Sequence, residues 1–168
     1  MITSRLISYL YLKVHGGEQF ITISQTRQFG LFILCAFFFY SCDFPKDPNN
    51  SFNDSKVYGL KVGVVNNPPY TNIFDNRFAG KEVRIIEEFA KQHELIIEYI
   101  IGSESVLIKQ LEQRKIQTII GGFNKNTVWT KHAGLTTPYD DVHVFLIPKG
   151  ENRLAFELEK HFNESLTQ

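Results

Sequence analysis

From residue 60 onward, hydrophobic positions recur with two periods that alternate along the chain. The segment "LKVGVV" (60–65) alternates and is rich in β-branched residues, which predicts a strand. In "KEVRIIEEFAKQH" (81–93), apolar residues recur at helical spacing, which predicts an amphipathic helix. "LIIEYII" (95–101) is almost continuously apolar, as is typical of a strand in a sheet covered on both faces.

The same alternation continues to the end of the chain. It predicts a second helix, two strands and a closing helix: 103–115, 116–122, 142–148 and 152–166. Ser103 or Ser105 fits the N-cap of the second helix. One face of the closing helix carries four apolar residues: Ala155, Leu158, Phe162 and Leu166. Because strand, helix, strand, helix and strand imply right-handed crossovers, we predict an α/β fold with three layers, a mainly parallel sheet with flanking helices.

The first 56 residues follow neither period. "FGLFILCAFFFYSC" (29–42) has no charge and is shorter than the ~20 apolar residues of a membrane-spanning helix. It fits the ~7–15-residue core of an export signal, with a buried core element as the alternative. The polar stretch 43–56, rich in Pro, Asn and Asp, predicts a flexible tether. We therefore divide the chain into an N-terminal lead with its signal segment (1–42), a tether (43–56) and an α/β lobe (57–168).

Charge and cysteine content narrow the function classes. The 18 basic and 18 acidic side chains give a net charge of zero, which offers no support for a nucleic-acid partner. Both cysteines, Cys35 and Cys42, lie in the apolar segment, so the predicted lobe has no internal disulfide and no thiolate metal site. The histidines His93, His132 and His143 lack metal-ligand spacing, and no Gly-Lys-Ser/Thr phosphate loop occurs. The sequence therefore predicts no cofactor and no metal.

Polar residues and glycines follow each of the three strands that are predicted to be parallel. In such sheets, ligands bind outside the carboxyl ends of the strands. These ends are Asn66-Asn67 through Tyr70, Gly102-Ser103, and Gly121 through Asn124. Gly121 and Gly122 let a backbone approach a small molecule closely, although a tight turn after a strand is the alternative. Because right-handed crossovers make the first and third strands adjacent, we expect the loops that follow them to be neighbours.

Four segments resemble the extracellular solute-binding proteins of family 3, the polar amino-acid binding proteins of ABC importers. They are "LKVGVVNNPPYT", the helix that starts after a glycine, "LEQRKIQTIIGGFNKN" and "GLTTPYDDVHVFLIPKG", and together they span roughly Leu60 to Lys149. The resemblance implies one lobe of a periplasmic-binding-protein type II fold, whose two lobes close on a ligand at a hinge. Ser41-Cys42 at the end of the apolar run resembles the lipobox of bacterial lipoproteins, in which the cysteine is acylated; this implies lipidation at Cys42.

The sequence departs from the family pattern in two ways. Only a helix follows the strand at 142–148, so we expect a single lobe that lacks the second one, with the helix at 152–166 packing back on it. The family's "T-x-x-R" motif, counted back from Pro138-Tyr139, places its carboxylate-binding Arg at Trp129. Because Trp cannot clamp an anion but can stack on a flat ligand or contact a cation, the site is expected to prefer flat or cationic solutes. A protein interface is the alternative role for this Trp.

The predicted ligand site therefore consists of six residues at the carboxyl ends of the strands: Asn67, Tyr70, Phe123, Asn124, Thr127 and Trp129. Tyr70 and Trp129 are expected to form two aromatic walls. The bland alternative is that Trp129 packs into the core of the lobe.

We interpret the chain as an exported, lipid-anchored solute-binding protein on the periplasmic side of a bacterial membrane. Its candidate partners are a small polar solute, a membrane transporter and a second chain that completes the cleft. One alternative is an interaction lipoprotein with a vestigial pocket. Another is an enzyme of the same fold, either dehydratase-like or associated with peptidoglycan lysis. Against an enzyme, Glu87-Glu88 is expected to be solvated, and the adjacent Asp140-Asp141 would point to opposite faces of a strand.

Overall fold

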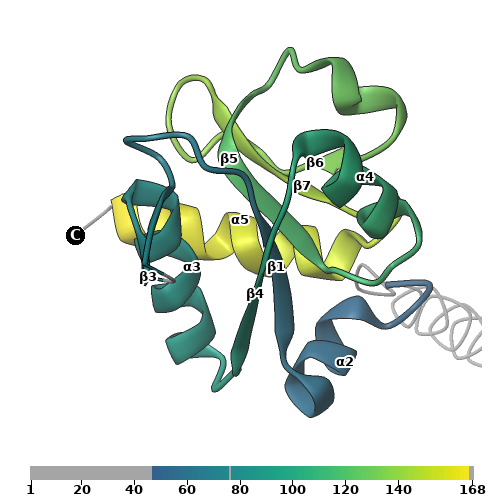
Figure 1. The fold of residues 1–168 in the computed structure, drawn as a ribbon. Helices are drawn as coiled ribbons and strands as arrows, with labels where there is room; N and C mark the ends of the chain where they lie inside the picture. Colours follow the sequence, from purple (N-terminus) through teal and green to yellow (C-terminus); the bar gives the residue numbers. More distant parts are fainter. Residues whose placement is uncertain (1–46, 76, 167–168) are drawn as a thin grey trace, which may run out of the picture. The chain divides into compact units, whose positions relative to one another are not determined.

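The computed structural model describes residues 47–75 and 77–166 of the chain (Figure 1). The helices and strands, in chain order, are α2 (Ser51–Tyr58), β1 (Leu60–Val64), β2 (Asn72–Phe74), β3 (Arg77–Ala79), α3 (Lys81–Gln92), β4 (Ile97–Ile101), α4 (Glu104–Glu112), β5 (Thr118–Asn124), the 3-10 helix η2 (Val128–Lys131), β6 (Gly134–Leu135), β7 (His143–Ile147) and α5 (Asn152–Leu166).

The main sheet confirms the predicted α/β fold. Its strand order is β4-β1-β5-β7-β6, with β1 parallel to both β4 and β5. The last two strands, β7 and β6, are antiparallel to their neighbours. Since β1 and β5 are adjacent and parallel, the loops that follow these two strands emerge side by side at the carboxyl ends of the strands, as predicted.

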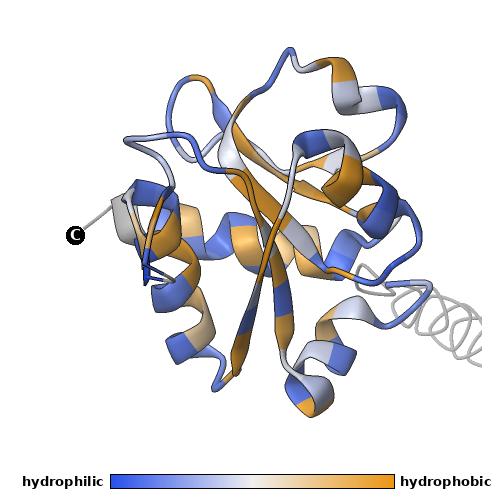
Figure 2. Ribbon diagram, viewed as in Figure 1, coloured by the Kyte–Doolittle hydropathy of each residue, from blue (hydrophilic) through white to orange (hydrophobic). Residues whose placement is uncertain are grey.

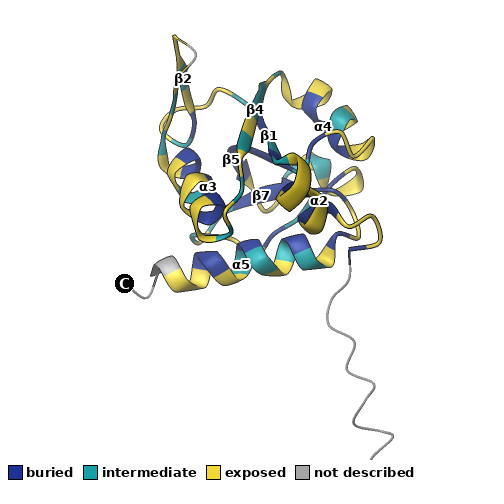
Figure 3. Cartoon of the chain, turned by 90° about the horizontal axis from the view of Figure 1, so that it is seen from below, coloured by how far each residue is buried: buried dark blue, intermediate teal, exposed yellow. Residues whose placement is uncertain are grey.

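Helices cover both faces of the sheet, and each face has its own hydrophobic core. One core joins α3 and α5 to the sheet, and its buried side chains include Ile86, Phe89 and Leu158. The other core lies under α4 and includes Leu107, Leu111 and Ile119. Figure 2 shows the apolar residues concentrated along the strands, and Figure 3 shows the buried stripes of the helices. No helix in the described part of the chain is long and apolar enough to cross a membrane.

The structure corrects the predicted tether. Residues 51–58 form the helix α2, and Phe52 at 1% exposure packs in the core beside α3 and α5. Residues 43–46, the rest of the predicted tether, lie outside the described residues, as do the lead and signal segment. A flexible tether would leave Phe52 in solvent, so from Asp47 onward this segment belongs to the folded lobe.

Polar residues that favour turns in a linker are used here as helix caps. The Asp47 carboxylate accepts the backbone N–H groups of Phe52 at 3.0 Å and of Arg153 at 2.7 Å, so it joins the first turns of α2 and α5. The buried Glu151 carboxylate accepts the N–H of Ser51 at 3.2 Å. Carboxylates are stabilising at helix N-termini because the first N–H groups have no partner within the helix. Composition alone does not distinguish this capped start from a tether.

We expect Phe52→Ala to lower the free energy of unfolding by ~3–5 kcal/mol, the usual cost of truncating a buried Phe. Val57→Ala, on the exposed side of the same helix, is the matched control and is expected to change stability by less than ~0.5 kcal/mol. Urea unfolding of the full chain measures both. Equal stability of the two variants would mean that residues 47–58 are a tether after all.

Candidate functional site

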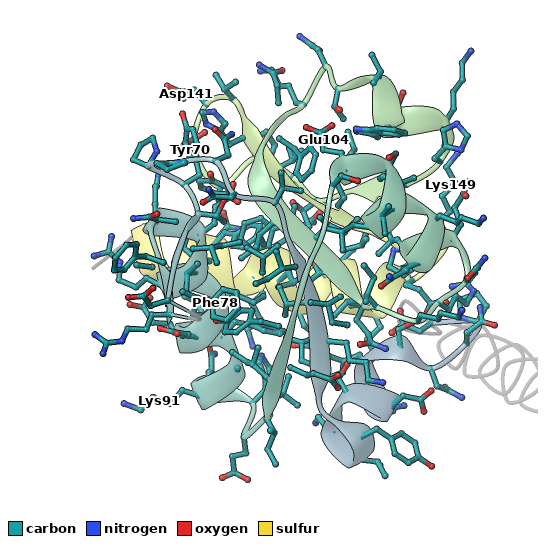
Figure 4. All side chains as sticks on the ribbon, viewed as in Figure 1. Tyr70, Phe78, Lys91, Glu104, Asp141 and Lys149 are labelled. Carbon is teal, nitrogen blue, oxygen red and sulfur yellow. The ribbon has the colours of Figure 1, made fainter. Side chains whose placement is uncertain are left out.

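The candidate site lies at the carboxyl ends of β1, β4 and β5. Three segments meet at this edge: the loop after β1, the first turn of α4, and the loop from β5 to η2 (Figure 1). Side chains from all three are drawn in Figure 4, where Tyr70 lies toward the Asp141 side of the edge and Glu104 toward the α4 side.

Asn67 and Tyr70 join the loop after β1 to strand β5. The Asn67 side-chain amide donates a hydrogen bond to the Gly121 carbonyl at 2.8 Å. Gly122 has a φ of 69°, and a Cβ atom there would lie 2.4 Å from the Tyr70 ring and 2.7 Å from the Asn67 amide. Glycine at this position therefore lets both side chains pack directly on the β5 backbone.

Thr127, Trp129 and Glu104 form a second group, at the α4 side of the edge. The Thr127 hydroxyl caps η2 by accepting the Trp129 backbone N–H at 3.5 Å. The Trp129 indole N–H donates to a carboxylate oxygen of Glu104, in the first turn of α4, at 2.7 Å. The Trp129 side chain is half-buried and packs against the core under α4. It is therefore neither a free aromatic wall nor a fully buried core residue.

Phe123 does not line an open cleft. It is 5% exposed and packs in the hydrophobic core under α4. Along β5 the residues alternate between the two faces of the sheet, so the side chain at position 123 points into the layer between the sheet and α4. Asn124, the next residue, is exposed, and its side chain accepts the backbone N–H of Asn126 at 2.8 Å.

Tyr70 and Trp129 contact different aromatic partners. The Tyr70 ring lies 4.3 Å from the His143 ring, and the Trp129 ring lies 6.1 Å from the His132 ring. His143 in turn stacks against Tyr139 at 6.1 Å. Five of the six predicted residues lie at the carboxyl ends of the strands. Four of them form two groups with separate partners, and the side chain of the fifth, Asn124, bonds within its own loop.

Beneath the Tyr70 group, a buried carboxylate fixes the two glycines of β5. Glu82, in the first turn of α3, is fully buried and accepts the N–H groups of Gly121 at 2.6 Å and Gly122 at 3.0 Å. Its other oxygen accepts the Tyr139 hydroxyl at 2.6 Å. One side chain therefore connects α3, the end of β5 and the loop before β7.

Burial shapes the ionisation of this buried pair. Burial raises the pKa of Glu82, and the hydrogen bonds from Tyr139, Gly122 and Gly121 only partly oppose the effect. The pKa of Tyr139 is raised too, first by burial and then by the negative charge of Glu82 and the hydrogen bond to it. The Tyr139 hydroxyl therefore stays protonated and remains a donor to Glu82 at neutral pH.

Asp140 closes the short loop before β7. One carboxylate oxygen accepts the N–H groups of Val142 at 2.9 Å and His143 at 2.7 Å, and the other bonds Lys81 at 3.0 Å. Burial acts to raise the pKa of Asp140, but these hydrogen bonds and one to the His143 ring outweigh it and hold the pKa below its usual range. Asp140 therefore carries a negative charge at neutral pH.

Two residues of this arrangement escaped the sequence analysis. Glu104 directly follows Ser103, so the rule that ligands bind at strand carboxyl ends could have found it. No such rule points to Glu82. It stands among the charged residues at the start of α3, next to the exposed Lys81, and the helical pattern there predicts that such residues are solvated. Glu87 and Glu88 are exposed, as expected.

A separate groove lies away from this edge. It has a volume of about 600 Å³ and is lined by β3, the start of α3 and the loop before β2, including Phe78, Lys81, Arg84 and Glu87. It is open to solvent. Apart from Lys81, the residues that line it do not belong to the network described above.

Comparison with known proteins identifies the fold. The model of the bacterial extracellular solute-binding proteins, family 3, matches residues 60–168. Among solved structures, the arginine-bound form of domain 1 of TmArgBP, the ArgBP from T. maritima, has a TM-score of 0.61 and 22% identity, and covers 66% of this chain and 97% of that domain. A mutant of the same domain, also arginine-bound, gives 0.64 and 21%, with 69% and 98% covered.

An ancestral amino acid-binding protein, AncCDT-1, described as a precursor of cyclohexadienyl dehydratase, has a TM-score of 0.64 at 11% identity and covers 70% of this chain and 94% of its own. At these identities the likeness concerns the fold. No curated protein sequence matches the chain.

We expect Glu82→Ala to leave three donors, two backbone N–H groups and one hydroxyl, without their acceptor. At ~1 kcal/mol or more for each, the free energy of unfolding should fall by at least ~3 kcal/mol. Glu82→Gln keeps an acceptor for the glycines and should cost less. Glu87→Ala, in the exposed part of α3, is the control and should be nearly neutral. Urea unfolding of the three variants measures these differences.

The difference in unfolding free energy between the wild-type protein and Glu82→Gln should also depend on pH. Because burial raises the folded-state pKa of Glu82 above its ordinary value, folding disfavours the ionisation of this side chain. The stability that this contributes is complete below the unfolded pKa and is lost as the pH rises through the folded pKa. The wild-type protein should therefore lose stability relative to Glu82→Gln as the pH rises; a difference that is constant, or that grows with pH, would contradict the assignment.

Proposed function

The chain belongs to the bacterial extracellular solute-binding proteins of family 3, and from this membership we propose that its lobe binds a small cationic solute at the carboxyl ends of β1, β4 and β5. The family match runs from β1 to the end of the chain and so includes every element that borders this edge. The candidate solute class is an amine or a guanidinium compound of amino-acid size.

The pairing of Trp129 with Glu104 is the observation that carries this proposal. The indole N–H holds the Glu104 carboxylate at 2.7 Å, and both residues are accessible to solvent. An aromatic face next to a carboxylate is the combination that recognises an ammonium or guanidinium group, by cation–π contact and a charge-assisted hydrogen bond. An anionic group would be repelled by the same carboxylate.

The charges of the neighbouring loops favour the same sign of ligand. The sequence from 115 to 152 contains no Arg that could clamp a carboxylate. Lys81 is held by Asp140, and Lys125 donates to the Asp141 carbonyl at 3.0 Å, so each of these two cations already has a partner. Lys131, on η2 with Trp129, is exposed to solvent. Tyr70, half-buried over Gly122, offers a further aromatic face.

A single lobe can serve as a binding unit, as a similar domain indicates. Domain 1 of TmArgBP, which the chain resembles over nearly the whole of that domain, is described as arginine-bound without its second domain. One lobe offers only half a cleft, and closed sites bury ~70–90% of a ligand. We therefore expect weaker binding than in a two-lobed protein, unless a second chain supplies the other wall.

A protein-interaction role is the second candidate. Val128, next to Trp129, is 80% exposed, and Val106 in the first turn of α4 is half exposed. Exposed aliphatic side chains beside an aromatic residue are typical of protein interfaces. In this role the surface around Trp129 would contact a side chain of the partner in place of a free solute.

We infer binding and not catalysis. Asp140 and Asp141 are the adjacent carboxylates that an acid–base mechanism could use. The Asp140 carboxylate already bonds two backbone N–H groups, Lys81 and the His143 ring. Its lowered pKa makes it a poor proton donor near neutral pH. AncCDT-1 is described both as an amino acid-binding protein and as a precursor of cyclohexadienyl dehydratase. An assay for dehydratase activity is therefore the test of the enzyme alternative.

We also propose that the protein is exported and held at a bacterial membrane by lipid at Cys42, with an importer as its membrane partner. Membership of an extracellular family supports export. The apolar segment 29–42 and its Ser41-Cys42 end support the anchor, and both lie outside the described residues.

The solute proposal predicts that L-arginine, L-lysine or putrescine changes the fluorescence of Trp129, the only Trp in the chain, whereas L-glutamate does not. Glu104→Gln keeps an acceptor for the indole but removes the charge, so the affinity for the active cation should fall by about 10- to 100-fold. Fluorescence titration of the full chain in detergent measures the dissociation constants.

Glu112→Gln is the matched control for this titration. Glu112 is an exposed carboxylate on the same helix, bonded to His132 at 2.7 Å, and its neutralisation should leave the affinity unchanged. Equal losses in both variants would mean a general charge effect. A fluorescence signal that no cation alters would favour the protein-interaction role.

The anchor proposal predicts that the protein, expressed with its N-terminal segment in a bacterium, incorporates labelled fatty acid and fractionates with membranes. Cys42→Ser should abolish the labelling, and Cys35→Ser, seven residues earlier in the same apolar run, should not. Labelling that persists in Cys42→Ser would exclude this cysteine as the acylation site.

A further inference from the structure

The apolar strand β4 is the outermost strand on one side of the sheet, so one of its long sides has no neighbouring strand among the described residues. It pairs with β1, over a regular five-residue register from Leu60↔Ile97 to Val64↔Ile101, and it is the terminal strand of the order β4-β1-β5-β7-β6. Figure 1 shows it in front of β1. None of its five residues is fully buried, and Ile101 is 53% exposed.

The direction of the β4 backbone follows from the bonds at its two ends. The Ile96 carbonyl accepts the Leu60 N–H at 2.7 Å, and the Gly102 N–H donates to the Val64 carbonyl at 3.3 Å. Because backbone groups alternate along a strand, the even-numbered residues of β4 face β1. The N–H and C=O groups of Ile97, Tyr99 and Ile101 therefore point outward, and no other described strand pairs with them.

This edge lacks the devices that usually prevent strand pairing. Edge strands are commonly protected by Pro, Lys, a bulge or very short length. The segment 95–101, "LIIEYII", contains no Pro and no Lys, has a single charge at Glu98, and keeps its register with β1 without a bulge. The sequence of β4 is therefore typical of a central strand, yet among the described residues β4 pairs only with β1.

We propose that β4 pairs antiparallel with the β4 of a second copy of this chain, about a two-fold axis that passes through Tyr99. In this register Tyr99 lies opposite Tyr99 of the other copy, and Ile97 lies opposite Ile101. Antiparallel strands bond at every second residue, so these three residue pairs use all the outward N–H and C=O groups of both strands. The two five-stranded sheets become one continuous sheet.

Backbone symmetry and side-chain charge both fit a second copy as the occupant of this edge. The outward groups are arranged symmetrically about Tyr99, so the strand is complementary to itself, as an isologous interface requires. Glu98 lies opposite Ile100, which keeps the two Glu98 carboxylates from facing each other, and each keeps Lys61 of its own chain at 3.8 Å. Tyr99 stacks on Phe78 at 4.2 Å, so the central residue of the interface is already held in place.

Cysteine cross-linking tests this register directly. The full chain with Cys35 and Cys42 replaced by Ser provides a background without thiols. Residues that face each other in an antiparallel bonded pair have Cα atoms ~5.5 Å apart, within disulfide range. We expect Tyr99→Cys to form a disulfide-linked dimer under mild oxidation in detergent.

Ile97→Cys is the matched control, because it lies on the same face of the same strand but ~13 Å from its own counterpart. It should stay monomeric, whereas the double variant Ile97→Cys with Ile101→Cys should cross-link, and it also covers the case in which Tyr99→Cys fails to fold. Ile101→Pro, which removes an outward N–H and leaves the β1 pairing intact, should abolish the dimer in analytical ultracentrifugation.

Cross-linking of Ile97→Cys as efficiently as Tyr99→Cys would indicate random association and overturn the proposal. So would monomeric behaviour of both Tyr99→Cys and the double variant while the chain is folded by circular dichroism. None of these readouts depends on a solute, so they remain informative if the solute-binding proposal fails.

Discussion

The carboxylate of Glu82 is the contact on which the candidate site depends. It accepts two backbone N–H groups at the end of β5 and the hydroxyl of Tyr139, and it is fully buried. An unsatisfied donor in this position would cost the full desolvation of the group. Because Glu82 stands in the first turn of α3, one side chain fixes the helix, the glycines and the loop before β7 relative to one another. The packing of Asn67 and Tyr70 on Gly122 follows from that arrangement.

A comparable carboxylate arrangement defines where the folded lobe begins. Asp47 caps α2 and α5 together, and Glu151 bonds both Ser51 and Arg114, the latter at 2.6 Å. The bonds from Asp47 to Arg153 and from Ser51 to Glu151 join segments 106 and 100 residues apart, and Phe52 packs in the core beside them. Since Glu151 is buried, its charge is stable there only because Arg114 and the N–H groups surround it. If Cys42 carries the lipid, only four residues separate it from the capping Asp47.

The candidate site combines an aromatic face with negative charge. Trp129 stands where the family pattern places a carboxylate-binding Arg, and its indole N–H is bonded to Glu104. If the lobe binds a solute here, as we propose, the Glu104 carboxylate would favour a cationic group on that solute. The exposed apolar residues do not all lie beside Trp129. Val128 borders the candidate site, whereas Ile101 ends the strand β4, whose outer side has no described neighbour.

The sequence by itself determined seven of the helices and strands, their order and the family. Period and composition are local properties, and they located β1, α3, β4, α4, β5, β7 and α5. The predicted adjacency of β1 and β5 is also present in the structure. The same reasoning placed Asn67, Tyr70 and Trp129 at one edge. It read residues 47–56 as a tether and Phe123 as part of the cleft, because turn-forming residues and a strand end look the same whether they are solvated or packed.

Only the tertiary structure decided which side chains are partners. Glu82 bonds residues 39 and 40 positions away, and Glu104 bonds Trp129 across 25 positions. No period or local preference records such distances, since they depend on how α3 and α4 pack on the sheet. The edge position of β4 is the same kind of fact. Its apolar sequence reflects the helices that pack on both of its faces, while the side on which it has no described neighbour is set by the order of the strands.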